Sequence, residues 1–265
     1  MRTLFLTMPL LLAACQAPAP PPAAFPNGEI VDLTYAFDEN TVYWPTASGF
    51  SRTTDFEGYT EAGYYYSAYS FCTAEHGGTH LDAPVHFAEG RQATDEIPLE
   101  RLMGPAVVVD VSARAAADRD YQVSVADFEA WEARHGRLPD GAIVLLRTGF
   151  GQYWPDRVRY MGTDARGPEA VADLHFPGLH PEAAAWLVAN RAIHAIGIDT
   201  PSIDHGPSTQ FETHRTLFAE NIPAFENVAH LDRLPETGAY VIALPMKIRG
   251  GSGGPLRIIA LVPEG

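Results

Sequence analysis

The chain has 265 residues, 46% of them hydrophobic, and its 33 acidic against 18 basic side chains give a formal net charge of −15. A surface this acidic excludes nucleic acid and anionic lipid as expected partners. The sequence shows no basic patch, internal repeat or coiled-coil heptad.

The N-terminus reads as a targeting segment. Arg2 precedes a short apolar run from Leu4 to Leu12, too short to span a bilayer, and Leu12-Ala13-Ala14-Cys15 follows. A cysteine after small residues resembles the bacterial lipobox, so we expect a lipoprotein signal peptide over 1–14 and a lipid anchor at Cys15. The alternative is that an ordinary secretory signal peptide is cleaved nearby and that Cys15 has no role in anchoring. Either way we expect an exported protein, periplasmic or in the cell envelope, whose only membrane contact is the lipid anchor.

Residues 15–26 are nearly all Ala and Pro, which predicts an extended tether rather than a packed core. The predicted domain therefore covers 27–265, and roughly 240 residues suffice for one domain with its own core. Only Cys15 and Cys72 occur, so a lipid on Cys15 leaves no disulfide. Cys72 is interpreted as a small buried hydrophobic residue, with a metal ligand as the alternative.

The expected helices and strands follow from the periodicity of hydrophobic residues and from the residues that interrupt it. Alternating or continuous apolar runs predict strands at 29–35, 64–73, 106–111, 141–148, 193–198, 239–244 and 256–262. A capped amphipathic pattern predicts a helix at 124–135, and a second helix is expected at 181–191. Strands outnumber helices without strict alternation, which predicts an α+β (mixed α/β) single domain with a curved, partly closed mixed sheet and packed helices.

The run Gly250-Gly251-Ser252-Gly253-Gly254 could suggest a phosphate-binding loop. It lacks the lysine and the following helix of such a loop, so we interpret it as a turn between two antiparallel strands.

The most informative window is 76–86, where His76, His80, Asp82 and His86 all occupy even positions. Side chains of an extended chain alternate faces, so these four can point the same way. Gly77, Gly78 and Pro84 disfavour a helix here. Imidazoles and a carboxylate suit a divalent transition metal with one position left open for water. Isolated histidines are more often packed or solvated residues, but such clustering favours a metal or catalytic site.

This window resembles the His-x-Gly-Thr-His-x-Asp-x-Pro-x-His signature of the metal-dependent cyclase family, which includes bacterial kynurenine formamidase and isatin hydrolase. The likeness continues at Tyr43-Trp44-Pro45, at Gly197-Ile198-Asp199-Thr200-Pro201-Ser202, and at His214 with Phe225-Glu226-Asn227. The resemblance implies the swivelling β/β/α fold of that family. It also implies a homo-oligomer acting on a small-molecule substrate.

The resemblance to the formamidase branch also implies roles. His76, His80, Asp82 and Glu226 would bind one ion, and Asp82, His214 and Glu226 a second, both zinc or alternatively manganese. His86 would be the general acid/base and Trp44 would contact an aromatic substrate. The isatin hydrolase branch looks mononuclear and lacks the late glutamate, so retention of both His214 and Glu226 points to the dinuclear branch.

The physical chemistry of these residues is consistent with hydrolysis. Two divalent ions held by bridging carboxylates lower the pKa of water from 15.7 to roughly 7. His86 titrates in the range needed to protonate a leaving nitrogen. The alternative for His86 is a further metal ligand. Glu226 lies among apolar neighbours, where a carboxylate is costly to bury unless a cation neutralises it.

Three further interpretations stay open. Trp44 either stacks on a substrate or packs at a turn. Asp199 and Asp204 flank a strand end, where either could hold a ligand histidine or cap a turn. Tyr64, Tyr65, Tyr66 and Tyr69 either line a pocket or cover the sheet.

The expected activity is a metal-dependent amidohydrolase acting on an aryl formamide such as formylkynurenine. The first alternative is a hydrolase of a cyclic amide or lactone, which an exported enzyme could meet in the environment. The others are a metal-dependent cyclase or lyase, and a non-catalytic metal-binding lipoprotein. His86 argues against the last, because metal storage needs no acid/base residue.

Overall fold

The computed structural model describes residues 28–263. The predicted signal peptide and the whole predicted tether, Cys15 included, lie outside this range. None of the helices in the described range is long and apolar enough to cross a membrane.

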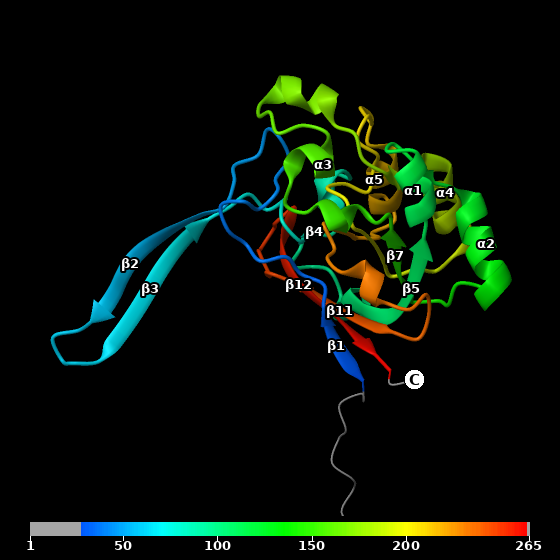
Figure 1. Ribbon diagram of the computed structural model, residues 1–265. Coiled ribbons are helices and arrows are strands. Elements are labelled where there is room, and N and C mark those ends of the chain that lie inside the picture. Colours follow the sequence, from blue (N-terminus) through cyan, green and yellow to red (C-terminus); the bar gives the residue numbers. More distant parts are fainter. Residues whose placement is uncertain (1–27, 264–265) are drawn as a thin grey trace, which may run out of the picture.

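One sheet organises the molecule (Figure 1). Its strand order is β1-β12-β11-β5-β7-β9-β10-β4, and β12 also pairs with β4, so the strands from β12 to β4 close into a barrel with β1 added at β12. The strands are β1 (Glu29–Asp32), β4 (His80–Asp82), β5 (Met103–Asp110), β7 (Ile143–Arg147), β9 (Ala195–Ile198), β10 (Ala224–Glu226), β11 (Tyr240–Pro245) and β12 (Gly253–Val262).

The sheet is mixed. β5, β7, β9 and β10 run parallel to one another, whereas β4, β11 and β12 make antiparallel pairs. The prediction of a curved mixed sheet with packed helices is therefore confirmed. Small residues such as Ala106, Ala195, Ala243 and Ala260 face the barrel interior among larger aliphatic side chains, which lets a narrow barrel fill its own core.

Helices α2 (Val125–His135), α4 (Pro181–Asn190) and α5 (Glu212–Phe218) cover the outside of the parallel strands. Helices α1 (Ser112–Ala117) and α3 (Arg157–Met161) contribute to a smaller, separate core cluster. The short 3₁₀ segments are η1 (Pro84–His86), η2 (Leu99–Leu102), η3 (Phe150–Tyr153), η4 (Pro168–Asp173) and η5 (Leu231–Arg233). Because side chains alternate along β7, Ile143 and Leu145 fill the barrel while Val144 and Leu146 pack under the helices. The same strands therefore contribute to both cores, the barrel interior and the layer beneath the helices.

Two short pairings lie outside the barrel. β6 (Gln122–Val123) pairs with β8 (Gly178–Leu179). β2 (Ser51–Tyr59) and β3 (Tyr65–Cys72) form a long antiparallel hairpin that projects away from the rest of the molecule (Figure 1). We call residues 51–72 the arm.

The elements predicted from sequence are present, with shifted ends. The helix at 124–135 is confirmed as α2, whose N-cap Ser124 forms a capping box with Asp127. The predicted strand at 29–35 is shorter, since only β1 is extended and paired. The glycine run does connect the antiparallel strands β11 and β12, but Gly253 and Gly254 already belong to β12. Not predicted were the strands β2, β6, β8 and β10 and the helices α1, α3 and α5.

Candidate metal centre and catalytic cavity

Two neighbouring strands place three of the predicted ligands. His80 and Asp82 lie on β4, and Glu226 on β10 is directly opposite His80 in the antiparallel register. Residues opposite each other in a pair share a face, so all three side chains point the same way. The alternate residues Leu81 and Phe225 point into the barrel core. The apolar side chains of these strands therefore anchor the polar ones on the outer face.

His76 and His86 reach the same place by other means. The expectation that all of 76–86 is one extended segment is wrong, because only His80–Asp82 is a strand. Gly78 has φ +58°, a left-handed conformation that turns the chain between His76 and the strand. After the strand, Pro84 starts η1, which carries His86. The side chains converge because these turns return both histidines to Asp82.

His214 comes from α5, far along the chain. Its Nδ1 lies 2.5 Å from Asp204 Oδ2, and that carboxylate also accepts the backbone N–H groups of Thr213 and His214. Asp204 thus fixes the ring with Nε2 facing the cluster. Asp199 instead accepts bonds from Thr148 and the Gly149 N–H, as a turn cap.

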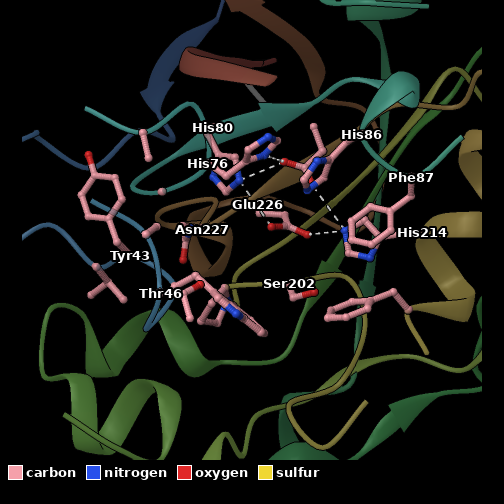
Figure 2. Close-up of a pocket in the computed structure, with 18 residues that line it drawn as sticks. Tyr43, Thr46, His76, His80, His86, Phe87, Ser202, His214, Glu226 and Asn227 are labelled. Atoms are coloured by element: carbon pink, nitrogen blue, oxygen red, sulfur yellow. Dashed lines mark hydrogen bonds and ion pairs between the residues drawn. The ribbon is translucent and has the colours of Figure 1, made fainter. Parts of the chain in front are cut away.

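The ligand atoms form two overlapping groups that share Asp82. Figure 2 shows His76, His80, His214 and Glu226 of these groups close together. In the first, Asp82 Oδ1 lies 2.7 Å from His76 Nδ1 and 3.0 Å from His80 Nε2. In the second, His214 Nε2 lies 3.3 Å from Asp82 Oδ2 and 3.1 Å from Glu226 Oε1. Glu226 Oε2 also lies 3.4 Å from His80 Nε2, so both carboxylates contact both groups.

The electrostatics of this cluster fit divalent cations. Burial raises the pKa of the Glu226 carboxyl, and the neighbouring Asp82 raises it further. Burial also raises the pKa of Asp82, but the surrounding histidines outweigh it and hold that pKa well below its usual range. Two carboxylates this close and this buried require positive charge between them.

His80 gives a second indication of a cation. Its Nδ1 lies 2.9 Å from the Gly78 carbonyl oxygen and donates to it, so the neutral ring carries its lone pair on Nε2. That buried Nε2 has no hydrogen-bond partner among the described residues and faces the carboxylates. An unprotonated, unpartnered imidazole nitrogen of this kind is the donor that a transition metal takes. The donor set therefore fits a divalent metal.

His86 stands at the edge of the cluster. Its Nε2 is 3.9 Å from Asp82 Oδ2, and its ring stacks on His76 with 3.8 Å between centroids. Burial lowers the pKa of His86 to about 4, and the neighbouring histidines add to the effect. This pKa is below the range that the sequence predicts for His86, and the ring is therefore neutral at pH 7 and able to accept a proton.

A cavity of about 290 Å³ opens in front of the cluster. Trp44, Phe87 and Phe211 line it, and the Phe87 ring packs 5.1 Å from that of Phe211. Trp44 also makes an edge contact with Phe176 and a tilted contact with Phe211, so it both packs at a turn and faces the cavity. None of the described residues that line the cavity is Lys or Arg.

Two of the interpretations drawn from sequence are wrong. Tyr64, Tyr65, Tyr66 and Tyr69 neither line the cavity nor cover the barrel, because they lie exposed on the arm. Cys72 ends β3 and is exposed rather than buried. Both errors have one cause: a strand rich in aromatic residues predicts a half-buried sheet, but this hairpin has no layer against it in the described chain.

The sequence did not reveal several residues that support the centre. Asn227 Nδ2 donates to the Gly78 carbonyl that also orients His80. Ser252 contacts His76 at 2.8 Å, from the glycine run. Phe87 follows His86 directly, and this adjacency was the one sequence signal for it.

The chain is similar to known proteins over most of its length. The family model named Cyclase ("Putative cyclase") matches residues 31–205. The chain is 32% identical over 250 residues to the isatin hydrolase of Roseibium aggregatum, covering 89% of this chain and 92% of that protein. It is 32% identical over 184 residues to the kynurenine formamidase of Salinibacter ruber, covering 69% of this chain and 74% of that protein.

The fold is also similar to a solved structure. Isatin hydrolase A from Ralstonia solanacearum superposes with a TM-score of 0.79 at 33% identity, over 88% of this chain and 92% of that chain.

Proposed function

The chain belongs to the cyclase family, and from this premise we propose that it is a metal-dependent hydrolase that opens the carbon–nitrogen bond of a small, neutral, cyclic aromatic amide. The observation that carries the substrate class is the cavity. It joins an aromatic wall to a buried His/Asp/Glu cluster and offers no described Lys or Arg to a substrate anion.

We propose that five residues hold two divalent ions, zinc or alternatively manganese: His76, His80, Asp82, His214 and Glu226. The proposal is supported by the two overlapping groups of ligand atoms, which share Asp82. Bound ions of this kind polarise a carbonyl and lower the pKa of water toward neutrality. The carboxylates of Asp82 and Glu226 contribute the negative charge that retains such ions in a buried site.

His86 is proposed to move the proton. Its neutral ring at the cavity edge accepts a proton as water adds to the amide carbon, and then delivers that proton to the departing aryl nitrogen. The carbon–nitrogen bond breaks, and the products are a carboxylate and an arylamine. In a cyclic amide both groups remain on one molecule.

The wall of the cavity would select and orient the ring. Trp44, Phe87 and Phe211 offer apolar and edge-on contacts that suit a flat aromatic substrate. A neutral cyclic amide needs no contacts beyond these for binding, because it carries no charge. Formylkynurenine, by contrast, carries the ammonium and carboxylate of an amino acid, and its carboxylate would need a cationic or strongly hydrogen-bonding partner.

Formamidase activity is the second candidate, because both His214 and Glu226 are present in the cluster and the Salinibacter ruber relative carries that name. One experiment separates the two. The metal-loaded, full-length protein is assayed with isatin and with formylkynurenine, before and after chelation.

We expect ring opening of isatin with kcat/KM at least about tenfold above that for formamide cleavage, and loss of both after chelation. If the protein instead prefers to release formate from formylkynurenine, its substrate is an aryl formamide and not a cyclic amide. Turnover that survives complete removal of metal would contradict the hydrolytic mechanism itself.

A further inference from the structure

We propose that Ser252 and Glu75 are positioning residues that fix His76 in the tautomer that binds a metal ion. The inference rests on the metal site of the proposed function and concerns the nitrogen through which His76 contacts that ion. Neither Ser252 nor Glu75 lines the catalytic cavity, so their effect on the site passes through the His76 ring.

Both nitrogens of the His76 ring have a close neighbour. Nδ1 lies 2.7 Å from Asp82 Oδ1, and Nε2 lies 2.8 Å from Ser252 Oγ. Ser252 Oγ in turn lies 2.7 Å from Glu75 Oε2, and the Ser252 backbone N–H donates to the same oxygen at 2.9 Å. These contacts form one chain of hydrogen-bonding groups that begins at Glu75 and ends at the Asp82 carboxylate.

The direction of the bonds along this chain is set by Glu75. An ionised carboxylate only accepts hydrogen bonds, so the Ser252 hydroxyl donates its single proton to Glu75. The hydroxyl oxygen can then only accept from His76, which requires the imidazole proton to lie on Nε2. In the neutral ring the lone pair is consequently on Nδ1, which faces Asp82 and the first group of ligand atoms.

The other two proposed ligand histidines are held in the opposite tautomer. His80 donates from Nδ1 to the Gly78 carbonyl. His214 donates from Nδ1 to Asp204, and both rings present Nε2 to the carboxylates of the cluster. His76 is the exception because it presents Nδ1. Its tautomer needs a separate explanation, and the hydrogen bond at its Nε2 supplies one.

Glycine at two positions of the run 250–254 explains how the serine comes so close to the imidazole. A Cβ on Gly253 would lie 2.6 Å from His76 Cε1 and 2.6 Å from the Leu81 carbonyl oxygen. A Cβ on Gly251 would lie 3.1 Å from Glu75 Oε1. Larger residues at these positions would push the run away from the histidine and from the glutamate. The run thus serves the metal centre and is more than a turn.

The backbone on either side of Ser252 is fixed from outside the run. The buried side chain of Thr94 donates through Oγ1 to the carbonyl oxygens of Gly251 and Gly253, at 3.0 Å and 3.2 Å. The Ser252 carbonyl accepts the N–H of Ala83 at 2.8 Å, directly after β4. The hydroxyl is therefore presented to the imidazole by a backbone that is already ordered, as a positioning role requires.

The first test reads the tautomers directly. Nitrogen-15 NMR of the full-length, zinc-loaded protein with labelled histidine distinguishes a ring protonated at Nδ1 from one protonated at Nε2. We expect three zinc-bound rings, of which only His76 carries its proton on Nε2. In Ser252→Ala this Nε2–H signal should shift or disappear, because its acceptor is gone. Three zinc-bound rings that all carry the proton on Nδ1 would contradict the assignment.

The second test is zinc affinity by chelator competition, with the visible spectrum of the cobalt-substituted protein as a readout of ligand geometry. Ser252→Ala should weaken binding of the first zinc equivalent about tenfold or more and alter the cobalt spectrum, because both tautomers of the ring become available. Glu75→Ala should act similarly, since the released hydroxyl is then free to donate to Nε2. Glu75→Gln should retain most of the affinity, because the Ser252 N–H selects the amide oxygen and that oxygen still accepts the hydroxyl.

A double variant shows whether Ser252 and Glu75 act along one chain. In that case Ser252→Ala/Glu75→Ala should bind zinc about as weakly as Ser252→Ala alone, because the second change removes nothing further. Independent effects would multiply to about a hundredfold loss and would contradict the chain. Thermal unfolding checks that each variant still folds.

The matched control is Ser112→Ala, on α1 and away from the cluster, which should equal the wild type in both tests. Unchanged zinc affinity and cobalt spectrum in a folded Ser252→Ala protein would overturn the inference. A wild type that binds no zinc would instead contradict the proposed function, so the two failures are distinguishable.

Discussion

At the scale of single residues, the histidines of the cluster differ in how they are held. His80 and His214 are buried, and each has Nδ1 bonded to a fixed acceptor, the Gly78 carbonyl or Asp204. His86 is only partly buried and lies 3.9 Å from Asp82 Oδ2. A ring that stands at the edge of the donors suits proton transfer better than coordination.

His86→Ala should therefore lower turnover on the order of 10²-fold or more, because the reaction loses its proton carrier. Metal content, measured on the same samples, should stay at the wild-type value. His135→Ala, a surface histidine paired with Glu236, is the control and should leave both unchanged. A His86→Ala protein that loses a metal equivalent would show that His86 is a ligand.

The sequence predicts the identity of the candidate ligands better than the route that brings them together. His76, His80 and Asp82 stand out because they are close in sequence, and the structure does gather them. The support from Asp204 and Ser252 depends on contacts across 10 and 176 positions of sequence, which no local pattern encodes. Spacing alone also overstated the extended conformation of the window, since glycine and proline turns bring His76 and His86 back to Asp82.

At the scale of elements, helix α2 was the most predictable because its signals are local. Ser124 caps it, Asp127 closes the capping box, and Phe128 and Trp131 face the core. Strands β4 and β10 are three residues each, too short to show a hydrophobic period, although they hold most of the site. The arm shows the opposite problem. Its sequence has a strong strand pattern, but that pattern does not specify whether anything covers the strand, so the burial of its tyrosines was predicted wrongly.

Ser124→Ala should destabilise the protein by about 1 kcal/mol, because the first turn of α2 loses its cap. Urea unfolding measures this as a lower midpoint with an unchanged slope. The helix packs on the barrel through the buried side chains of Phe128 and Trp131 and does not line the cavity, so kcat/KM should not change. An unaltered midpoint would mean that the cap contributes nothing to this helix.

At the scale of the whole molecule, the barrel fold and the cellular location of the protein depend on different parts of the chain. The closed sheet positions β4 and β10 for the metal centre, while the location depends on residues outside the described range. We propose that the chain is exported and anchored through Cys15, supported by Leu12-Ala13-Ala14-Cys15 and the Ala/Pro segment after it.

Cys15→Ser should abolish fatty-acid labelling and leave unprocessed precursor, because the serine hydroxyl cannot replace the lipidated thiol. Cys72→Ser is the matched control, since Cys72 is the other cysteine of the chain and should not affect labelling. Labelling that persists in Cys15→Ser would show that the protein is not anchored through this residue.

The central claim is that one cluster of side chains binds two ions, and counting metal tests it most directly. Elemental analysis of fully loaded wild-type protein should give about two equivalents per chain, since Asp82 and Glu226 contact both groups of ligands. His214→Ala should retain about one, because it removes a ligand from the second group only. A single equivalent in the loaded wild type would contradict the two-ion centre and leave His76, His80 and Asp82 as a one-metal site.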